Sequence, residues 1–403
     1  MALVLFLALS LAVTLLAVIV VKQRARYDWL SERVRMVIDS SRENTTNLKD
    51  LIQDVRVVDG VVAAATRWPS TPTIRRWSEP TERVVLLLPG AAYHLPEVTR
   101  LADALGSRGV PARIASGRPH WLRLEAGARW ITEDVYDLPS PDQLGEDVSA
   151  VVTLKDWGGY GDVVAAAKAR GIPTFAKVEG AQDFNDVDTG QDRKPYTHAD
   201  HILCQGQNDF DALSGSRFII GSSRLERLWS APPAPRPPAR AIINVNFTYG
   251  VLDSARELYT ESAIEGCRIA GIPYTLAIHP AEYAIKSAHT STIPISRLLD
   301  VGTVLISRFS TVPFEAMARD IAFIYHNPHG EKVPTFQNPE GAFDVSTNAA
   351  ELGEAIAQNG PGKDVRKRSA TFFAKQVDMD PRRSSAERTA DVINSTATRF
   401  SKG

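Results

Sequence analysis

The order of hydrophobic and polar positions divides the chain into segments of different kinds. Residues 2–21, ALVLFLALSLAVTLLAVIVV, carry no charge. A helix of about 20 residues is about 30 Å long, which matches the hydrocarbon core of a bilayer. Lys22, Arg24 and Arg26 follow this run, whereas a cleaved signal peptide would carry its basic residues in front. The pattern therefore predicts a single-pass anchor in the cell membrane over 1–22, with the body of the protein cytoplasmic.

Residues 23–66 continue with a helical pattern. Apolar or small positions recur in alternating steps of four and three from Leu30 to Val58, with polar Ser41 and Asn44 in the middle. This spacing is typical of a coiled coil, which tolerates a polar pair. Two interpretations stay open, namely a homodimer formed through this stalk or a single amphipathic helix packed on its own domain. Residues 67–81 contain prolines and are predicted to be a linker.

From residue 82 onward, short apolar runs alternate with helical patterns. Runs such as RVVLLLPG and IPTFAKVEG are predicted strands, and helical runs such as DVVAAAKARG end at a glycine. The alternation predicts parallel βαβ units over 82–231 and again over 239–360. Between them PPAPRPP, at 232–238, predicts a stiff linker. Residues 361–403 are predicted to form a helix or tail. We therefore expect an α/β protein with two Rossmann-like domains facing a cleft, preceded by the anchor and the stalk.

Composition and motifs exclude several classes of protein. The formal net charge of −1 gives no reason to expect nucleic-acid binding. Cys204 and Cys267 are far apart, so neither a structural zinc site nor a disulfide framework is expected. The turn TLKDWGGYGDVV is neither a P-loop nor a dinucleotide fingerprint, which argues against ATP hydrolysis and a nicotinamide cofactor. Its Lys155 is a candidate contact to an acceptor; the alternative is a tight turn without a ligand.

Two predicted strand ends in the second domain carry candidate ligand groups. IHPAEY places His279 after a strand and before a proline, hence in an extended turn. One βα unit later, LISRFSTVPFEAM places Arg308, Ser310 and Thr311 between a strand and a helix. Hydroxyls and N–H groups at a helix start bind phosphate oxygens, and an arginine can pair with phosphate. Glu315 in the first turn can cap the helix or accept from ribose hydroxyls. A capping hydroxyl alone would explain part of this pattern.

IHP and SRFSTVPFEA together resemble the His-Pro and T-D-x-S-S-x-x-F-[DE] pair of one group of GT-B enzymes, the CDP-glycerol glycerophosphotransferases and capsule-polysaccharide glycosyltransferases. The resemblance implies that His279, Ser310 and Thr311 bind the pyrophosphate of the donor. It places Glu315 at the acidic position. Ser-Arg replaces the usual Thr-Asp, so the resemblance implies that Arg308 marks either a different donor or a site that has lost its chemistry.

The first domain carries a weaker resemblance to the same group. Glu179-Gly180, in TFAKVEGAQDF, stands where the group has a His-Gly pair. The resemblance makes Glu179 the candidate base for the acceptor hydroxyl, because a carboxylate can act as a base when burial raises its pKa. The alternative is a solvated loop acid. IIGSSRLERL is similar to the G-x-P-R-x-D element of the group, with Gly221 and Arg224 matching.

One further loop of the second domain is a candidate for donor contacts. NVNFTYG ends the first predicted strand there, and in GT-B enzymes this loop faces the donor phosphates. Asn246, Thr248 and Gly250 are therefore candidate contacts. The resemblance implies a reaction without a metal ion or another cofactor, in which the helix dipole and side chains stabilise the leaving diphosphate.

The resemblance implies a transferase at the cytoplasmic face of the membrane. It would move a sugar or a polyol phosphate from a nucleotide-activated donor to a cell-envelope glycan or a lipid-linked acceptor. Two alternatives stay open. A nucleotide-sugar 2-epimerase shares the GT-B fold, although a membrane anchor argues against it. A catalytically degenerate scaffold of an envelope-synthesis complex would explain the replaced His-Gly and Thr-Asp pairs.

Overall fold

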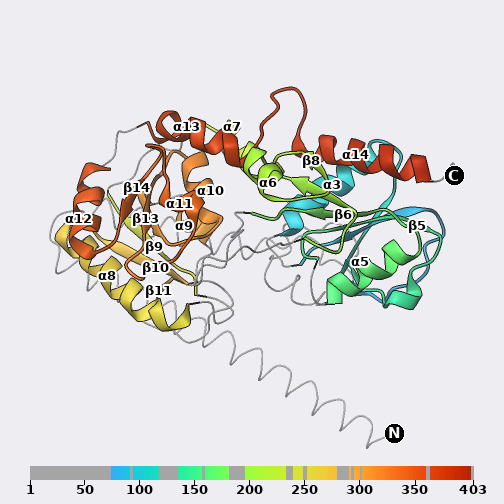
Figure 1. Ribbon diagram of the computed structural model, residues 1–403, viewed down its shortest axis with the longest axis horizontal. Coiled ribbons are helices and arrows are strands. Elements are labelled where there is room, and N and C mark those ends of the chain that lie inside the picture. Colours follow the sequence, from blue (N-terminus) through green and yellow to red (C-terminus); the bar gives the residue numbers. More distant parts are fainter. Residues whose placement is uncertain are drawn as a thin grey trace, which may run out of the picture. The chain divides into compact units, whose positions relative to one another are not determined.

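The computed structural model (Figure 1) shows an α/β protein and divides the chain into two compact units, 1–67 and 68–403. The described residues all belong to the second unit. They are 74–90, 94–117, 135–156, 159–180, 196–232, 239–247, 252–278, 290–291, 295–299, 302–359 and 364–400.

The predicted membrane anchor over 1–22 and the coiled-coil stalk over 23–66 lie outside these described residues, as does most of the predicted linker at 232–238. Among the helices that the structure describes, none is both long enough and apolar enough to cross a bilayer. This finding contradicts the predicted location as a single-pass protein of the cell membrane, and that prediction is corrected here. The predicted homodimer depends on the stalk and stays a prediction.

The first sheet has eight parallel strands in the order β1-β4-β3-β2-β5-β6-β7-β8. Its strands are β1 (Ile74–Arg75), β2 (Val84–Leu88), β3 (Ala112–Ser116), β4 (Val135–Asp137), β5 (Val148–Thr153), β6 (Thr174–Lys177), β7 (His201–Cys204) and β8 (Ser216–Ile219). Its helices are α3 (Leu95–Gly106), the short 3₁₀ helix η2 (Pro141–Gln143), α5 (Gly159–Ala169), α6 (Gln207–Ala212) and α7 (Ser223–Ser230).

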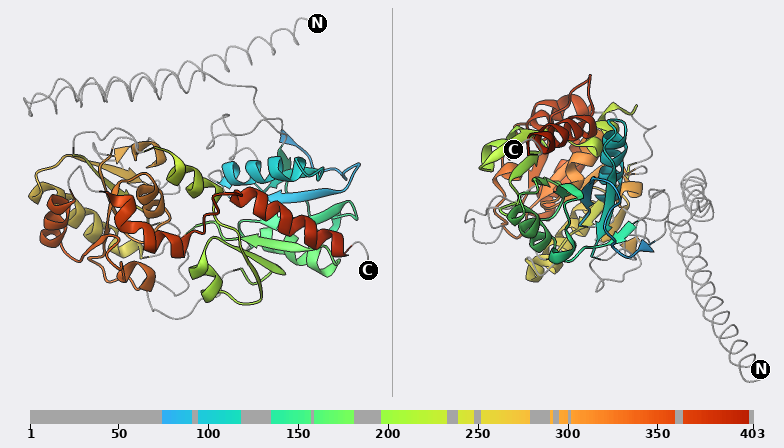
Figure 2. Two further views of the ribbon diagram at one scale, coloured as in Figure 1. Left: turned by 90° about the horizontal axis from the view of Figure 1, so that it is seen from above. Right: turned by 90° about the vertical axis from the view of Figure 1, so that its right-hand side faces the viewer.

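Both faces of the first sheet are covered, which explains why its central strand β2 is apolar at every position. Val85 and Leu87 pack into one cluster with α3, whereas Leu86 and Leu88 pack into another with α5. Successive side chains of a strand point to opposite faces, so a strand covered on both sides is a continuous apolar run. Helix α14 (Ser385–Phe400) also covers this sheet and lies along α3 (Figure 2).

The second sheet has six parallel strands in the order β11-β10-β9-β12-β13-β14. The strands are β9 (Ala241–Val245), β10 (Tyr274–Ile278), β11 (Thr290–Ser291), β12 (Val304–Ser307), β13 (Ala322–His326) and β14 (Asp344–Ser346). Its helices are η4 (Asp253–Ala255), α8 (Arg256–Ile269), α9 (Ile295–Leu298), α10 (Val312–Ala318), α11 (Pro334–Gln337), α12 (Ala349–Gln358) and α13 (Val365–Gln376).

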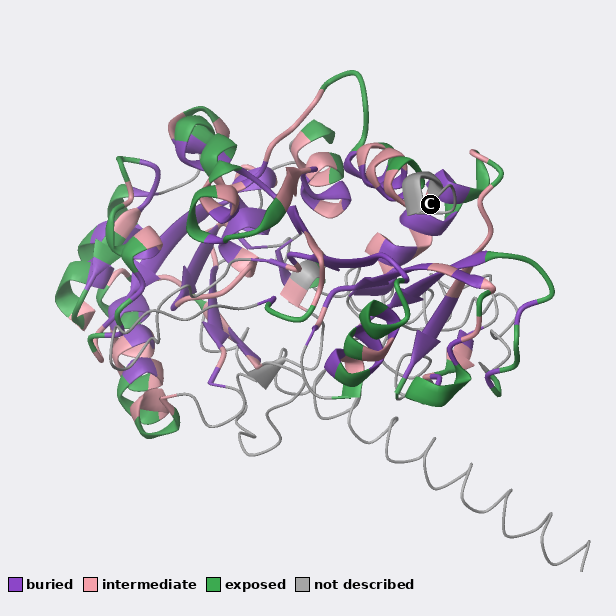
Figure 3. Cartoon of the chain, turned by 45° about the vertical axis from the view of Figure 1, so that its right-hand side comes forward, coloured by how far each residue is buried: buried purple, intermediate pink, exposed green. Residues whose placement is uncertain are grey.

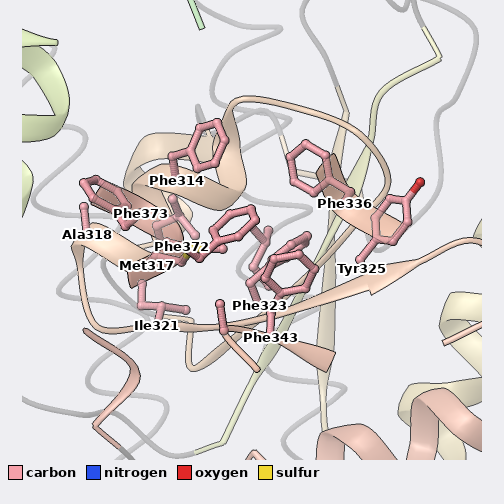
Figure 4. Packing of buried hydrophobic residues seen from close by; sticks show 14 of the residues in the cluster. Phe314, Met317, Ala318, Ile321, Phe323, Tyr325, Phe336, Phe343, Phe372 and Phe373 are labelled. Atoms are coloured by element: carbon pink, nitrogen blue, oxygen red, sulfur yellow. The ribbon is translucent and has the colours of Figure 1, made fainter. Parts of the chain in front are cut away.

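The second sheet is also a buried layer (Figure 3). One face packs on α8 and α12. The other packs on α10 and α13 through a cluster rich in aromatic rings, which includes Phe314, Phe323, Phe336, Phe343 and Phe373 (Figure 4). We call each sheet with its covering helices a domain, and α14 belongs to the first domain although it follows the second in the chain.

Both sheets reverse their strand order beside the first strand of a βα series. The reversal lies between β2 and β5 in the first sheet and between β9 and β12 in the second. In open α/β sheets, ligands bind outside the carboxyl ends of the strands at such a reversal. The loops that follow β2, β5, β9 and β12 are therefore the first place to look for a site.

Candidate active site

Three loops of the first domain meet at the carboxyl edge of the sheet. They follow β2, β5 and β6 and carry His94, Lys155 and Glu179. Gly90 fills the space between the first two loops: a Cβ there would lie 2.8 Å from Lys155 Cβ and 3.4 Å from His94 Cε1. Only glycine leaves room for this approach, so Gly90 brings the β2 and β5 loops together.

His94, which is buried, and Glu179, which is partly exposed, form a pair at this edge. The N–H of Gly90 donates to His94 Nδ1 at 3.0 Å, so the proton of a neutral imidazole lies on Nε2. Nε2 contacts Glu179 Oε2, and the histidine side chain is 4% exposed against 24% for the glutamate. The N–H of Glu179 donates to the hydroxyl of Tyr196 at 3.3 Å. Glu179 is thus held through its side chain and its backbone, while part of its carboxylate stays accessible.

Tyr196 is the buried neighbour that supports this loop. It is 3% exposed, and burial, together with the nearby charge of Glu179, raises the pKa of its hydroxyl well above the usual range. The hydroxyl therefore keeps its proton at physiological pH. It can accept from Glu179 N–H without placing a second negative charge beside the carboxylate.

In the second domain, Ser310 and Thr311 lie half-buried between β12 and α10, as their sequence context predicts. The N–H of Val312 donates to Ser310 Oγ at 3.3 Å. Asn246 follows β9, the neighbouring strand, and its carbonyl faces the β12 loop. Three other predicted contacts, His279, Thr248 and Gly250, lie outside the described residues.

Arg308 points into the domain. Its Nε and Nη2 contact Glu331 Oε2 at 2.7 and 2.6 Å, and its Nη1 donates to the carbonyl of Asn246 at 2.9 Å. Burial alone would raise the pKa of Glu331, but His329, Arg308 and the N–H of Phe309 outweigh it, and the pKa falls to about 2. Every nitrogen of the guanidinium has a protein partner, so Arg308 fixes the turn after β12.

Two contacts join the loops of the two domains. A Cβ at Gly180 would overlap Thr311 Oγ1 and lie 2.9 Å from Thr311 Cγ2, so these residues touch. Arg224 of α7 contacts Glu315 Oε1 at 2.5 Å, and Glu315 is 2% exposed. The structure therefore places the Glu179 loop directly against Thr311, and it uses Glu315 to bind an arginine of the first domain.

One remaining predicted contact, Lys155, lies in the loop after β5, at the same edge of the first sheet as Glu179. The turn is closed by Thr153, whose Oγ1 accepts from Lys155 N–H at 3.0 Å. The Nζ of Lys155 is 6.0 Å from the ring centre of Tyr160. Among the described ranges there is no group of three His, Cys, Asp or Glu side chains that could hold a metal ion.

Sequence reasoning missed His94 and the partner of Arg224. His94 immediately precedes α3, and Pro96 follows within that helix's first two positions, so a histidine with a nearby proline follows a predicted strand here too, although Leu95 separates the two residues. That signal was present in PGAAYHLPEV. The Arg224–Glu315 contact gives no local signal, because its two partners are 91 positions apart in different domains.

Comparison with known proteins places the fold. The sequence matches no protein-family model and no curated protein. Among solved structures, the UDP-GlcNAc 2-epimerase of Methanocaldococcus jannaschii, in complex with UDP-GlcNAc and UDP, is similar with a TM-score of 0.55 and 11% identity, over 77% of this chain and 99% of that one. The glycotransferase of kitacinnamycin is similar with a TM-score of 0.51 and 12% identity, over 78% of this chain and 99% of that one. The wall teichoic acid polymerase TagF is similar with a TM-score of 0.50 and 9% identity, over 89% of this chain and 100% of that one.

These identities are low, so the likeness establishes the fold and not the reaction. It agrees with the two parallel sheets of this chain. The predicted GT-B fold is confirmed, and the similar structures with this fold include both glycosyltransferases and UDP-GlcNAc 2-epimerases.

Proposed function

We propose that the protein is a GT-B transferase that moves a group from a nucleotide-activated donor to an acceptor hydroxyl. The observation that carries the proposal is the His94–Glu179 pair at the edge of the first sheet, joined through Gly180 to Thr311 of the second domain. A base on one domain beside hydroxyls on the other is the arrangement that this transfer needs, because acceptor and donor must meet between them.

Glu179 is the proposed base. The acceptor hydroxyl donates to the accessible part of its carboxylate, and the proton passes to Glu179 as the hydroxyl oxygen bonds to the transferred group. His94 keeps its Nε2 proton and holds Oε2, so its role is to orient the carboxylate. The bond between the transferred group and the donor phosphate breaks, and the nucleotide leaves with the electron pair.

Ser310 and Thr311 are the proposed contacts to the leaving phosphate. Their hydroxyls lie at the end of β12, beside the base, where negative charge develops as the donor bond breaks. Arg308 is left out of this set, since its guanidinium is bound to Glu331 and Asn246. Contacts from His279, Thr248 and Gly250 stay predictions. The epimerase similar in fold was solved with UDP-GlcNAc and UDP, which makes UDP-sugars the first donors to test.

An epimerase is the second candidate. The similarity to the Methanocaldococcus jannaschii enzyme extends over 77% of this chain. The two reactions differ in what they require. An epimerase converts UDP-GlcNAc alone, whereas a transferase releases UDP only when an acceptor, or slowly water, takes the sugar.

Binding and turnover by the full chain test the proposal. Calorimetry with UDP, CDP, GDP and CMP is expected to identify one nucleotide that binds, with binding weakened in Thr311→Val and unchanged in the exposed control Thr197→Val. Glu179→Gln should keep this binding and lose turnover, whereas Glu146→Gln, an exposed acid in the same domain, should keep both. Full turnover in Glu179→Gln would refute the assignment of the base.

Proton NMR of UDP-GlcNAc incubated without an acceptor separates the two enzymes. Appearance of the 2-epimer would favour the epimerase. A chain that binds none of the four nucleotides would fit the scaffold that the replaced His-Gly and Thr-Asp pairs suggest.

A further inference from the structure

Five arginines gather where α7 packs between α3 and α10. Burial lowers the pKa of Arg227, and the charges of four other arginines lower it further. These side chains come from both domains, which means that the positive charge accumulates along the contact between them. They are Arg100 of α3, Arg224 and Arg227 of α7, Arg297 of α9 and Arg319 at the end of α10.

Arg100 and Arg227 also line a groove on the first domain. The groove has a volume of about 890 Å³ and is bounded by α3, α7, the start of α14 and the segment 379–384 that leads into α14. It does not include the His94–Glu179 pair. A groove of this size can hold a group as large as a nucleotide or a short chain of phosphates. Arg382 and Arg383 line the same groove from its other side.

Acidic side chains on the lining are largely engaged by the protein itself. Glu226 accepts from Ser385 N–H at 2.9 Å, and Glu387 accepts from Ser384 N–H at 2.8 Å. Asp380 accepts from Arg382 N–H at 2.8 Å. These hydrogen bonds hold the start of α14 and the segment before it. Asp380 and Glu387 lie on the α14 side of the groove, whereas Glu226 belongs to α7 and Asp103, which also lines the groove, belongs to α3 together with Arg100.

Arg100 itself supports an incoming ligand. Its Nη1 is buried, and it has no hydrogen-bond partner among the described residues. A buried donor without a partner costs free energy, and so do guanidinium groups held near one another. An anion between Arg100 and Arg227 would relieve both, because the planar fork of arginine matches the oxygens of a phosphate.

We propose that this groove binds a diphosphate group at a site separate from the donor site, with Arg100 and Arg227 as ligands and Arg297 and Arg319 adding positive charge from the second domain. A concave site with several arginines suits a compact, multiply charged group better than a flat membrane surface or a nucleic-acid duplex. That the diphosphate belongs to the acceptor rests on the function proposed above, whereas the site itself does not.

The position of the cluster gives the bound anion a consequence for the reaction. Arg224 of the cluster contacts Glu315, which lies one helical turn after Thr311. An anion between Arg100 and Arg227 would neutralise part of the positive charge that faces Arg297 and Arg319 of the second domain. Binding of the acceptor would therefore favour the arrangement in which Glu179 and Thr311 face the same substrate.

Calorimetry of the full chain with inorganic pyrophosphate tests the site. We expect binding that weakens as salt is raised, and that weakens about tenfold or more in Arg227→Gln and in Arg100→Gln. Arg268→Gln is the control, since Arg268 is an exposed arginine of α8 paired with Glu265. It should bind pyrophosphate as the wild type does. Unchanged affinity in both groove variants would overturn the proposal.

Two further measurements separate this site from the donor site and identify the source of the diphosphate. UDP affinity should be unchanged in Arg227→Gln, and saturating UDP should not displace pyrophosphate; displacement would assign the anion to the donor site and overturn the proposal. Failure of all four nucleotides, UDP, CDP, GDP and CMP, to bind, with pyrophosphate binding intact, would refute only the proposed function. Farnesyl diphosphate binding more tightly than pyrophosphate would support the site and assign a lipid-linked source, and equal affinity would support it with a soluble source.

Discussion

Asp209 offers a direct test of how burial controls a charge in this fold. Its side chain is buried in the first turn of α6, where its Oδ2 accepts from Gln205 N–H at 2.8 Å. Burial raises the pKa of this carboxyl from 3.8 to about 7. The folded protein therefore keeps the proton up to about pH 7, whereas the unfolded chain releases it near pH 3.8.

The free energy of unfolding should fall as pH rises through this interval. Between the two pKa values the folded state binds more protons than the unfolded state, so deprotonation favours unfolding until about pH 7 and has no further effect above it. Each pH unit is worth about 1.4 kcal/mol, so the interval of about three units amounts to about 4 kcal/mol. Between pH 5 and pH 8, Asp209 should account for a loss of about 3 kcal/mol.

Asp209→Asn separates this contribution from the rest of the protein, because the amide oxygen can still accept from Gln205 while the charge is removed. Urea unfolding followed by circular dichroism at pH 5, 6, 7 and 8 should show a loss of stability about 3 kcal/mol smaller in the variant than in the wild type. Asp211→Asn, in the same helix but exposed, should follow the wild type. An equal pH dependence in Asp209→Asn and wild type would refute the reasoning.

Three other substitutions test particular contacts. Gly180→Ala places a methyl group into the side chain of Thr311, so the proposed transfer should slow by about a hundredfold, and an unchanged rate of nucleotide release would contradict this close contact. Glu331→Gln removes the buried partner of Arg308 and should lower the free energy of unfolding, measured with urea at pH 7, by about 3–5 kcal/mol. The pKa of Glu331 is about 2, so the wild type should keep this contribution above about pH 4.5 and lose it as pH falls toward 2. Phe373→Ala leaves a cavity in the aromatic cluster of the second domain and should lower the free energy of unfolding by about 3–5 kcal/mol in the same urea measurement. A loss below about 1 kcal/mol would be incompatible with the complete burial of Phe373.

Strand ends were the part of the site that could be predicted from sequence. Lys155, Glu179 and Arg308 each follow a short apolar run, and the structure places each of them in the loop after a parallel strand. The prediction works because a strand buried on both faces must be apolar, so the first polar residues after it mark its carboxyl end. The same logic gave the α/β fold with parallel sheets.

The choice of partner could not be predicted in the same way. Arg308 follows β12 whether it binds a phosphate or Glu331, and only the folded loop after β13 brings that carboxylate to it. His94 lies in a loop whose pairing with Glu179 depends on the close approach permitted by Gly90. The uncharged apolar run at 2–21 predicted a location in the cell membrane, and that prediction is contradicted. One hydrophobic segment was therefore not enough to predict where the protein is located.

Helix α14 has a consequence for how the protein is made. Ala390 and Ile393 belong to the core of the first domain, yet about 165 residues separate α14 from β8, the last strand of that sheet. At about 5–20 residues per second, a ribosome would need on the order of ten to thirty seconds to supply this helix after β8 has been made. During that time the α3 side of the first sheet stays uncovered at the place where α14 later packs. The first domain to be synthesised is therefore the last to be completed, and a chaperone that shields this surface would act on it before the second domain has folded.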